Sequence, residues 1–375
     1  MKLVIISHTE HYKSTEGKIV GWAPTINEIN HLAPYFESIT HIAMLHNSAV
    51  PKSATGYTGD NIHFVALPVL GGKGLLNKLK TIIYIPKVIG IVNRTLKDKD
   101  AFQLRTPTGI GVFLIPYLTL FSKKKGWYKY AGNWKQEKPP LGYSIQRYLL
   151  KKQSRLVTIN GRWPNQPNHC LTFENPCLRN EDLEIGKKIA VNKSIDNKIN
   201  FCYVGRLETP KGVGRIIEAF KSLNPKQKSR IGEVHFVGDG SEKLDFERLA
   251  KNSDINFKFH GYLGREAVFE IYKKSHFFLM PTTASEGFPK VIAEASNFGC
   301  VPMVSSVSAI AQYVKHQKNG FVVSPITAEG LKIQLEDIMH LDTTTYQNLT
   351  KSGQQFVQKF TFQYYRDRIL TEILS

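Results

Sequence analysis

The chain has 375 residues and 42% of them are apolar, so it can form two domains with separate cores, and a disordered or fibrous chain is excluded. Its net charge is +19, and no run reaches the roughly 18–20 apolar residues that a membrane span requires. Residues 1–180 carry 24 Lys and Arg against 9 Asp and Glu, so we expect this basic half to meet an anionic partner. Acidic phospholipid, a diphosphate-linked lipid acceptor and nucleic acid all fit that description.

The N-terminal sequence MKLVIISHT is too short and too quickly polar for a secretory signal, and it predicts a first strand instead. The four cysteines have no zinc spacing, so we expect reduced thiols in a cytoplasmic protein. Leu3–Ser7 has the continuous apolar pattern of a buried parallel strand. His8 to His11 are then expected in a loop at its carboxyl end, where open α/β sheets bind ligands. A His-x2-His metal pair is the alternative, but no third ligand lies nearby.

Pro24 begins a predicted helix, and His41–Leu45 a strand. Residues 71–99 alternate leucine and isoleucine with lysine, including Lys73 and Lys78, in what we predict to be one helix broken near Pro86. Two interpretations stay open for this helix. It is either a core-facing helix with a solvated charged side or a basic amphipathic surface that rests on anionic lipid.

Asp98-Lys99-Asp100 has the form of an Asp-x-Asp metal motif, but it precedes a strand, so we interpret it as a loop. Residues 100–107 predict that strand and a turn, and Ile110–Phe121 a buried helix.

Residues 121–155 contain ten basic residues and one acid, Glu137, with four aromatic residues interleaved: Trp127, Tyr128, Tyr130 and Trp134. Aromatic residues among lysines suit single-stranded nucleic acid or a membrane interface. No RNA-binding signature accompanies them, so we favour a membrane or polyanion over nucleic acid. A solvated basic loop is the remaining alternative.

Leu156–Asn160 and Cys170–Phe173 are predicted as the last strands of the first domain, and the polar run 187–200 as a linker. A second alternation of strands and helices follows. Its predicted strands are Phe201–Val204, Val234–Val237, Phe257–His260, Phe277–Met280, Val301–Ser305 and Gly320–Val323, with helices at Val213–Leu223 and Thr361–Leu374. This pattern predicts an α/β protein with two Rossmann-like, doubly wound parallel sheets.

The stretch PTTASEGFPKVIAEA (281–295) places Glu286 in a loop and Glu294 about two turns into the following helix. Pro289 suits the first helical turn, and Gly287 lets the backbone approach a ligand. Free amides at the helix start favour anionic or hydroxyl oxygens, so the stretch suits a sugar nucleotide. The alternative is a capped surface helix.

These residues resemble the Glu-x7-Glu signature of the family-4 retaining glycosyltransferases, which have the GT-B fold. Residues 201–220, FCYVGRLETPKGVGRIIEAF, resemble the same family's Gly-Arg-x4-Lys-Gly segment. VGDGS (237–241) and the stretch 259–281 lie between them in the family's order and spacing. The resemblance is strong over residues 199–325 and weak before them.

The resemblance implies two domains that face each other across a cleft and a transfer that needs no metal or cofactor besides the sugar nucleotide. It implies that Arg206 and Lys211 stabilise the leaving diphosphate, and that Glu286, with the amides of Gly287 and Phe288, holds the donor sugar. Glu294 is implied to bind the ribose. The further donor-binding positions are Gly205, Gly238, Gly261, Tyr262, Leu263, Pro289 and Lys290.

The family's first loop usually has a Gly-Gly pair, for which this chain offers only the separated Gly17 and Gly21. Arg105 stands where the family often has a histidine. We expect His8 and Arg105 on the acceptor side, where Arg105 binds a phosphate or acidic group, or else pairs with a nearby carboxylate.

The expected domains are residues 1–190 for the acceptor, 191–355 for the donor, and a helix at 356–375 that crosses back. The expected acceptor is a lipid-linked glycan or a growing surface polysaccharide, reached at the inner face of the plasma membrane without specific nucleic-acid binding. The alternatives are another GT-B enzyme, such as an epimerase, and a non-catalytic basic scaffold on membrane or RNA.

Overall fold

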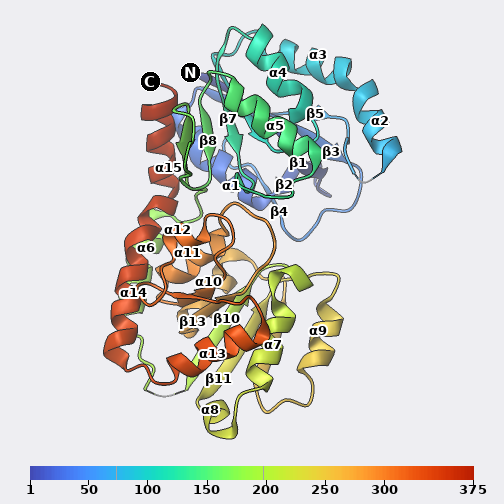
Figure 1. Cartoon of the computed structure of the whole chain (residues 1–375). Coiled ribbons are helices and arrows are strands. Elements are labelled where there is room, and N and C mark those ends of the chain that lie inside the picture. The colour runs from blue at the N-terminus through green and yellow to red at the C-terminus, as the bar shows by residue number, and fades with distance from the viewer. Residues whose placement is uncertain (73, 197) are drawn as a thin grey trace. The chain divides into compact units, whose positions relative to one another are not determined.

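The computed structural model describes residues 1–72, 74–196 and 198–375, and it divides into two compact units (Figure 1). Unit 1 contains Met1–Glu174 and Tyr365–Ser375, and unit 2 contains Asn175–Tyr364. The chain therefore leaves unit 1 before residue 190, where the sequence placed the boundary, and returns to it after residue 355. Lys73, which the sequence assigned to the basic helix, lies outside the described residues.

Unit 1 contains a nine-stranded sheet whose parallel part runs in the order β5-β3-β1-β6-β7-β8-β9. Strands β2 and β4 add an antiparallel edge to the carboxyl-terminal part of β1. The bounds are β1 Lys2–Lys13, β2 Ile19–Trp22, β3 Ser38–His46, β4 Ala54–Gly56, β5 Ile62–Leu67, β6 Ala101–Thr106, β7 Lys125–Tyr130, β8 Val157–Ile159 and β9 Cys170–Thr172.

Strand β1 extends well beyond the predicted Leu3–Ser7. Its register against β3 shifts between Ile6 and Glu10, and its last residues pair with β2. The prediction that His8 to His11 form a loop is therefore wrong. The hairpin was missed because its turn contains one glycine with positive φ, Gly17, instead of a glycine pair. Gly21 is required in β2, because a Cβ there would lie 2.5 Å from the His11 ring.

The helices of unit 1 cover the sheet, and the predicted break near Pro86 is confirmed. Helix α2 ends at Ile83, and α3 begins at Ile85 with Pro86 in its first turn, where a missing N–H costs nothing. The predicted helix over Ile110–Phe121 is also confirmed, as α4. The bounds are α1 Ala23–Leu32, η1 Ala33–Tyr35, α2 Leu75–Ile83, α3 Ile85–Leu96, α4 Gly111–Phe121 and α5 Leu141–Lys152.

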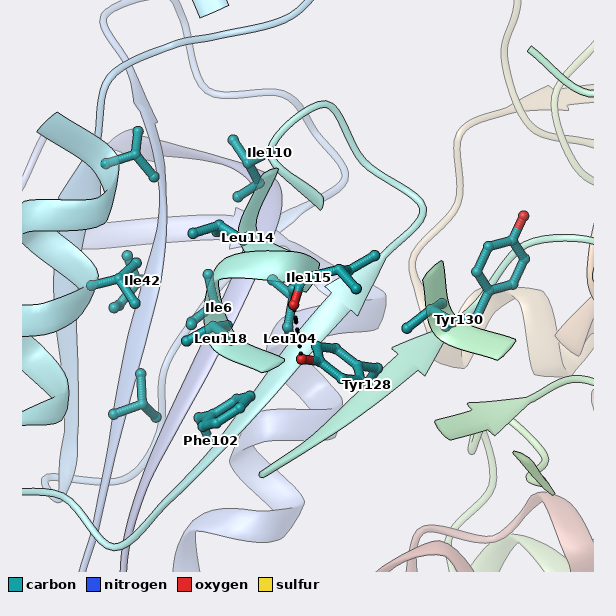
Figure 2. Packing of buried hydrophobic residues seen from close by; sticks show 14 of the residues in the cluster. Ile6, Ile42, Phe102, Leu104, Ile110, Leu114, Ile115, Leu118, Tyr128 and Tyr130 are labelled. Atoms are coloured by element: carbon teal, nitrogen blue, oxygen red, sulfur yellow. Dashed lines mark hydrogen bonds between the residues drawn. The ribbon is translucent and has the colours of Figure 1, made fainter. Parts of the chain in front are cut away.

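A core of large apolar side chains lies between the sheet and helices α3, α4 and α5 (Figure 2). Phe102 and Leu104 of β6 meet Leu114 and Leu118 of α4 in this core. Tyr128 of β7 also belongs to it, and its hydroxyl donates to the carbonyl of Ile115 at 3.2 Å.

The four aromatic residues among the lysines, Trp127, Tyr128, Tyr130 and Trp134, are all buried in unit 1. The prediction that they line a membrane or polyanion interface is therefore wrong. Trp127, Tyr128 and Tyr130 were misread because the buried parallel strand β7 is flanked by lysines, and Trp134 lies in the loop after it. The lysine inside the strand, Lys129, is itself buried and bound to the carboxylate of Glu28 at 2.7 and 2.8 Å.

The end of the chain contributes to the core of unit 1. Helix α15 (Phe362–Arg368) and η4 (Ile369–Ile373) carry Tyr365, Ile369 and Ile373 into a cluster with Leu3 and Trp127. Tyr365 also accepts a hydrogen bond from Lys129 Nζ at 3.2 Å, and the ammonium lies 4.5 Å from its ring centroid. The C-terminal segment is thus part of the first fold unit in packing and in polar contacts.

Unit 2 contains a six-stranded, wholly parallel sheet in the order β12-β11-β10-β13-β14-β15. All six predicted strands are present, and β13 has the predicted bounds. The bounds are β10 Ile199–Val204, β11 Ile231–Val237, β12 Asn256–Gly261, β13 Phe277–Met280, β14 Val301–Val304 and β15 Phe321–Val322.

The polar run 187–200 is only partly the linker that the sequence predicted. Helix α6 continues to Val191, and buried Lys193 donates to the carbonyl of Tyr272 at 2.8 Å; Asn197 lies outside the described residues. The bounds in unit 2 are α6 Asn180–Val191, η2 Thr209–Lys211, α7 Val213–Lys221, α8 Pro225–Ser229, α9 Lys243–Ala250, α10 Arg265–Lys274, α11 Lys290–Asn297, α12 Ile310–Tyr313, α13 Ala328–Ile338, α14 Thr343–Val357 and η3 Gln358–Phe360. Within the described ranges, no helix has both the length and the apolar character to cross a bilayer.

Candidate active site

Three neighbouring strands of unit 2 end in glycine at the same edge of the sheet. Gly205 follows β10, Gly238 follows β11 and Gly261 ends β12. The Gly205 amide donates to Val237 O at 3.0 Å, and the Gly238 amide donates to Gly261 O at 2.8 Å. A Cβ on Gly238 would lie 1.9 Å from Gly205 O, so only glycine fits there. The carboxyl edge of the sheet is therefore backbone without side chains, which a ligand can approach closely.

Lys211 and Glu286 are neighbours although they are 75 positions apart in the sequence, and their side chains form an ion pair. Lys211 comes from the loop between β10 and α7, and Glu286 comes from the loop between β13 and α11. Their side chains are 11% and 32% exposed, so both groups can reach a ligand while the lysine stem stays packed. The structure thus brings together the cation and the carboxylate of the two sequence motifs.

Main-chain carbonyls hold these two loops together. The Thr283 amide donates to Pro210 O at 2.8 Å, and the Arg215 guanidinium of α7 donates to Pro281 O at 2.9 and 3.0 Å. Gly212 has a φ of 95°, and a Cβ on it would lie 2.5 Å from Pro281 O. A side chain at position 212 would separate the loops, so glycine is needed for the contact between Lys211 and Glu286.

The two cations of the first motif differ in environment. The pKa of Lys211 is lowered to about 8, mainly by burial and also by the nearby charge of Arg206, while Glu208 opposes the shift. Arg206 is 72% exposed and pairs with Glu208 at 3.1 Å. Lys211 is therefore a poorly solvated cation with a packed stem, and Arg206 is a solvated one that has room to bind an anion.

The turn before α11 offers backbone donors beside Glu286. Among the described residues, the amides of Gly287 and Phe288 donate to no other protein atom. The Phe288 ring is buried and lies 4.7 Å from the Phe360 ring and 4.8 Å from the Tyr313 ring, centroid to centroid. Packing of this ring fixes the position of its amide, and buried Pro289 lies directly before the first turn of α11 and not within it as the sequence suggested.

Glu294 lies inside α11, four residues after Lys290 and thus on the same helix face. Burial raises the pKa of its carboxyl, and the charges of Arg265 and Lys290 partly offset that effect. The Tyr272 hydroxyl donates to Glu294 Oε2 at 3.4 Å. Such a carboxylate can accept hydrogen bonds from ligand hydroxyls. Tyr262 is exposed and Leu263 half-buried just beyond Gly261, so they form the rim of the same sheet edge.

One ring nitrogen of His8, in unit 1, can form a hydrogen bond with a ligand. Its Nε2 is buried and has no hydrogen-bond partner among the described residues. A Cβ added to Gly71 would lie 3.0 Å from His8 Cε1, and one added to Gly109 would lie 3.5 Å from the same atom. The His8 ring therefore lies between the loops that follow β5 and β6. Burial also lowers the pKa of His8, so the neutral imidazole is favoured. His11, in contrast, is fully engaged: Nδ1 contacts Thr9 O at 3.0 Å and Nε2 the Tyr57 hydroxyl at 3.0 Å.

Arg105 does not fit the expected role of binding a phosphate on the acceptor. Its guanidinium donates to Glu28 Oε1 at 2.6 Å, to Gln103 at 3.0 Å and to Thr25 at 3.3 Å. Glu28 is 2% exposed and also binds Lys129, so Arg105 balances a buried carboxylate. The second sequence interpretation, an ion pair with a nearby carboxylate, is the correct one, and Arg105 is removed from the acceptor-side residues.

The sequence missed residues that hold the site in shape. Glu242 accepts hydrogen bonds from the amide, at 3.0 Å, and the hydroxyl of Thr209, and it thereby joins the loop after β11 to the loop of Lys211. Arg215 was hidden inside a predicted amphipathic helix. Neither residue has a pattern that would have identified its partner.

The candidate metal ligands Asp98 and Asp100 belong to unit 1 and have local partners. Asp98 pairs with its neighbour Lys99 at 2.9 Å, and Asp100 accepts from the Lys2 amide at 2.6 Å, so both stabilise the loop before β6. Over the described ranges, no three His, Cys, Asp or Glu side chains are grouped as metal ligands would be.

Comparison with known proteins finds similarity to a family in part of the chain. Residues 184–356 match the sequence model of the glycosyl transferases group 1. An uncharacterized glycosyltransferase of Methanocaldococcus jannaschii is 27% identical over 162 residues, which are 42% of this chain and 40% of that protein. The lipopolysaccharide 1,6-galactosyltransferase of Salmonella typhimurium is 28% identical over 135 residues, 35% of this chain and 36% of that enzyme. These alignments thus span about 40% or less of the curated relatives.

Solved structures resemble the chain over its whole length. HepE of Anabaena, in complex with UDP and glucose, has a TM-score of 0.68 at 16% identity and covers 100% of both chains. Sucrose-phosphate synthase of Thermosynechococcus elongatus has a TM-score of 0.73 at 15% identity and covers 99% of this chain and 98% of the other. The chain therefore has the GT-B fold, and the part of it that matches the model of the glycosyl transferases group 1 contains Lys211, Glu286 and the glycine-lined sheet edge.

Proposed function

We propose that this chain is a glycosyltransferase that moves a sugar from a nucleoside-diphosphate sugar to a glycan acceptor. The observation that carries the proposal is the contact of Lys211 with Glu286 beside the glycine-lined edge of the unit 2 sheet. The cation suits the diphosphate of such a donor, and the carboxylate and the free amides suit its sugar hydroxyls. The glycine-lined backbone edge leaves room for the nucleoside.

Lys211 and Arg206 are proposed to stabilise the departing diphosphate. Negative charge builds up on that group as the bond to the anomeric carbon breaks, so fixed cations lower the barrier more than they strengthen ground-state binding. Lys211 supplies a point charge, and Arg206 can exchange Glu208 for two phosphate oxygens. Two such cations can fulfil the role of a divalent metal, so we expect activity to survive a chelator.

The carboxylates are proposed to bind hydroxyl groups. Glu286, with the amides of Gly287 and Phe288, holds the donor sugar, and Glu294 holds the ribose. Lys290 begins helix α11, which carries Glu294, and Pro289 directly precedes it. Gly205, Gly238 and Gly261 form the floor under the nucleotide, with Tyr262 and Leu263 beside the base. We expect the transfer to retain the configuration of the anomeric carbon. In such a transfer the leaving phosphate accepts the proton of the acceptor hydroxyl, so the leaving group and the acceptor lie on the same face of the sugar.

The acceptor is proposed to be a growing surface polysaccharide, carried on a lipid or free. Support comes from two relatives: the Salmonella enzyme is named for lipopolysaccharide, and another, of Erwinia amylovora, is named for amylovoran biosynthesis. His8 is the proposed acceptor-side residue, because its unpartnered Nε2 can bind a hydroxyl group. The four cysteines are free, which fits a cytoplasmic location.

A screen for donor binding tests the proposal. Unfolding temperatures are compared with and without UDP-, GDP- and ADP-sugars, because a ligand that binds the folded state alone raises the transition. HepE was solved with UDP-glucose, so we expect the UDP series to give the largest shift. Product analysis with a bound donor separates a transferase from an epimerase-like enzyme. No shift with any nucleotide, together with salt-sensitive RNA binding, would support a non-catalytic scaffold instead.

A further inference from the structure

We propose that helix α2 (Leu75–Ile83) docks unit 1 on an anionic phospholipid bilayer, whether or not the chain transfers a sugar. The described side chains of α2, residues 77 and 79–83, include none that is buried. Leu79, Ile82 and Ile83 are 54%, 61% and 67% exposed. Figure 1 shows the helix at the rim of unit 1, at the outer end of the α2–α3 pair. Three large aliphatic side chains exposed on one short helix are an apolar patch that another apolar surface can cover.

The three exposed residues form one face. They have the spacing i, i+3 and i+4, which brings side chains to the same side of a helix. Lys80 is exposed beside this face, and the ammonium of Lys87 lies 5.6 Å from the ring centroid of Tyr84 at the start of α3. Large aliphatic side chains with lysines at their border are the composition of a helix that lies in a membrane interface.

The positive charge of the stretch around α2 favours a bilayer with anionic lipids as the partner. No Asp or Glu occurs between Asp60 and Asp98, while this stretch contains Lys80, Lys87 and Arg94. A second copy of the chain would bring the same lysines against each other across a symmetric interface, which is unfavourable. An anionic headgroup layer pairs with the lysines, and the acyl boundary below it takes up the isoleucines.

The lysines at 123–125 are less suitable for a test, although the sequence singled them out. Lys124 Nζ donates to Lys97 O at 3.3 Å, and Lys125 Nζ donates to Ser375 O. Changing them would remove contacts within unit 1 as well as surface charge. Substitutions at Lys80, Ile82, Ile83 and Lys87 are better suited, because all four residues are exposed and the contact of Lys87 with the Tyr84 ring is a long one, 5.6 Å.

The test is co-sedimentation of the full chain with vesicles of phosphatidylcholine alone or with phosphatidylglycerol added. We expect binding only to the anionic vesicles, and release as salt rises. Ile82→Ser with Ile83→Ser should weaken binding by about tenfold or more, because two aliphatic side chains no longer enter the interface. Lys80→Gln with Lys87→Gln should weaken it by about thirtyfold, because each lysine near the surface contributes roughly a factor of five.

The matched control removes two exposed aliphatic residues elsewhere: Ile185→Ser with Val191→Ser, on α6 of unit 2. This variant should bind like the wild type, and circular dichroism should show that all variants are folded. Equal binding to both vesicle types, no binding at low salt, or equal loss in the control would overturn the proposal. A loss of self-association in the Ile82/Ile83 variant without any vesicle binding would identify a second copy as the partner.

Discussion

Lys211 is an ammonium group in a position where water solvates it poorly. Its stem is packed and its charge lies beside both Arg206 and Glu286. Such a group is sensitive to what else occupies the site, because a dianionic ligand would replace lost solvation with direct interaction. The position suits a cation that interacts most strongly when charge develops on a bound phosphate.

At the level of single residues, Lys211→Ala or Arg206→Ala should lower turnover by about 10²-fold or more, as does the loss of one donor to an oxyanion. The chain should stay folded, because Arg206 is exposed and Lys211 pairs with a half-exposed carboxylate. Steady-state kinetics with the best donor from the binding screen is the measurement, with Lys332→Ala on α13 as the control. Near-wild-type turnover in both variants would rule out the diphosphate assignment.

The lowered pKa of Lys211 predicts how donor binding depends on pH. Below pH 8 the ammonium is charged and binds the diphosphate; above pH 8 it loses its proton in the free protein. Affinity should therefore fall by up to about tenfold per pH unit above 8, since one proton must be taken up on binding.

Titration calorimetry with UDP between neutral and alkaline pH measures this dependence, because the nucleotide phosphates are already ionised in that range. Lys211→Arg is the informative comparison. It keeps a charge at all these pH values, so its affinity should be nearly constant. An equal decline in the arginine variant would assign the pH dependence to another group.

At the level of elements, the site depends on two loops joined through backbone carbonyls. The close approach at Gly212 predicts that Gly212→Ala destabilises unit 2 by about 2 kcal/mol, because a Cβ would collide with Pro281 O in a conformation with positive φ. It should also weaken donor binding by moving Lys211. Thermal unfolding and calorimetry measure the two effects.

The control for that change is Gly264→Ala, where nothing lies within 4 Å of the added Cβ. This variant should differ little from the wild type in stability and in donor affinity. Equal effects of the two substitutions would show that the loss of glycine flexibility, and not the contact with Pro281, is responsible.

The sequence predicted the elements of unit 2 well because their information is local. Strands β10, β11, β13 and β14 are short apolar runs, β10 and β11 are followed directly by a glycine, and helices α7, α10 and α11 begin next to a glycine or proline. The pairing of Lys211 with Glu286 was accessible only through the order of motifs. In unit 1, Arg105 and Lys129 were misjudged because their partner Glu28 is far away in sequence, and no local pattern reports a buried carboxylate. The β1–β2 hairpin was also missed, because it is defined by the hydrogen bonds between its two strands and not by a periodic pattern of apolar residues.

At the level of the whole molecule, the chain returns at its end to the unit in which it began. Tyr365–Ser375 supplies Ile369 and Ile373 to a core that already contains Leu3 of the first strand. The stability of unit 1 therefore depends on both ends of the chain, whereas all the proposed donor residues lie within 175–364. Two cores with separate sets of residues should respond separately to mutation and to ligand.

This separation predicts the result of calorimetric unfolding. Ile369→Ala and Leu335→Ala each remove a fully buried aliphatic side chain, the first from the core of unit 1 and the second from helix α13 of unit 2. Each should cost about 2–5 kcal/mol and lower a different transition. The donor nucleotide should then raise the transition that Leu335→Ala lowers and leave the other unchanged, because it stabilises only the unit that binds it. If it raised the transition that Ile369→Ala lowers, the donor would bind to unit 1, and a single transition lowered by both variants would show that the two cores unfold together.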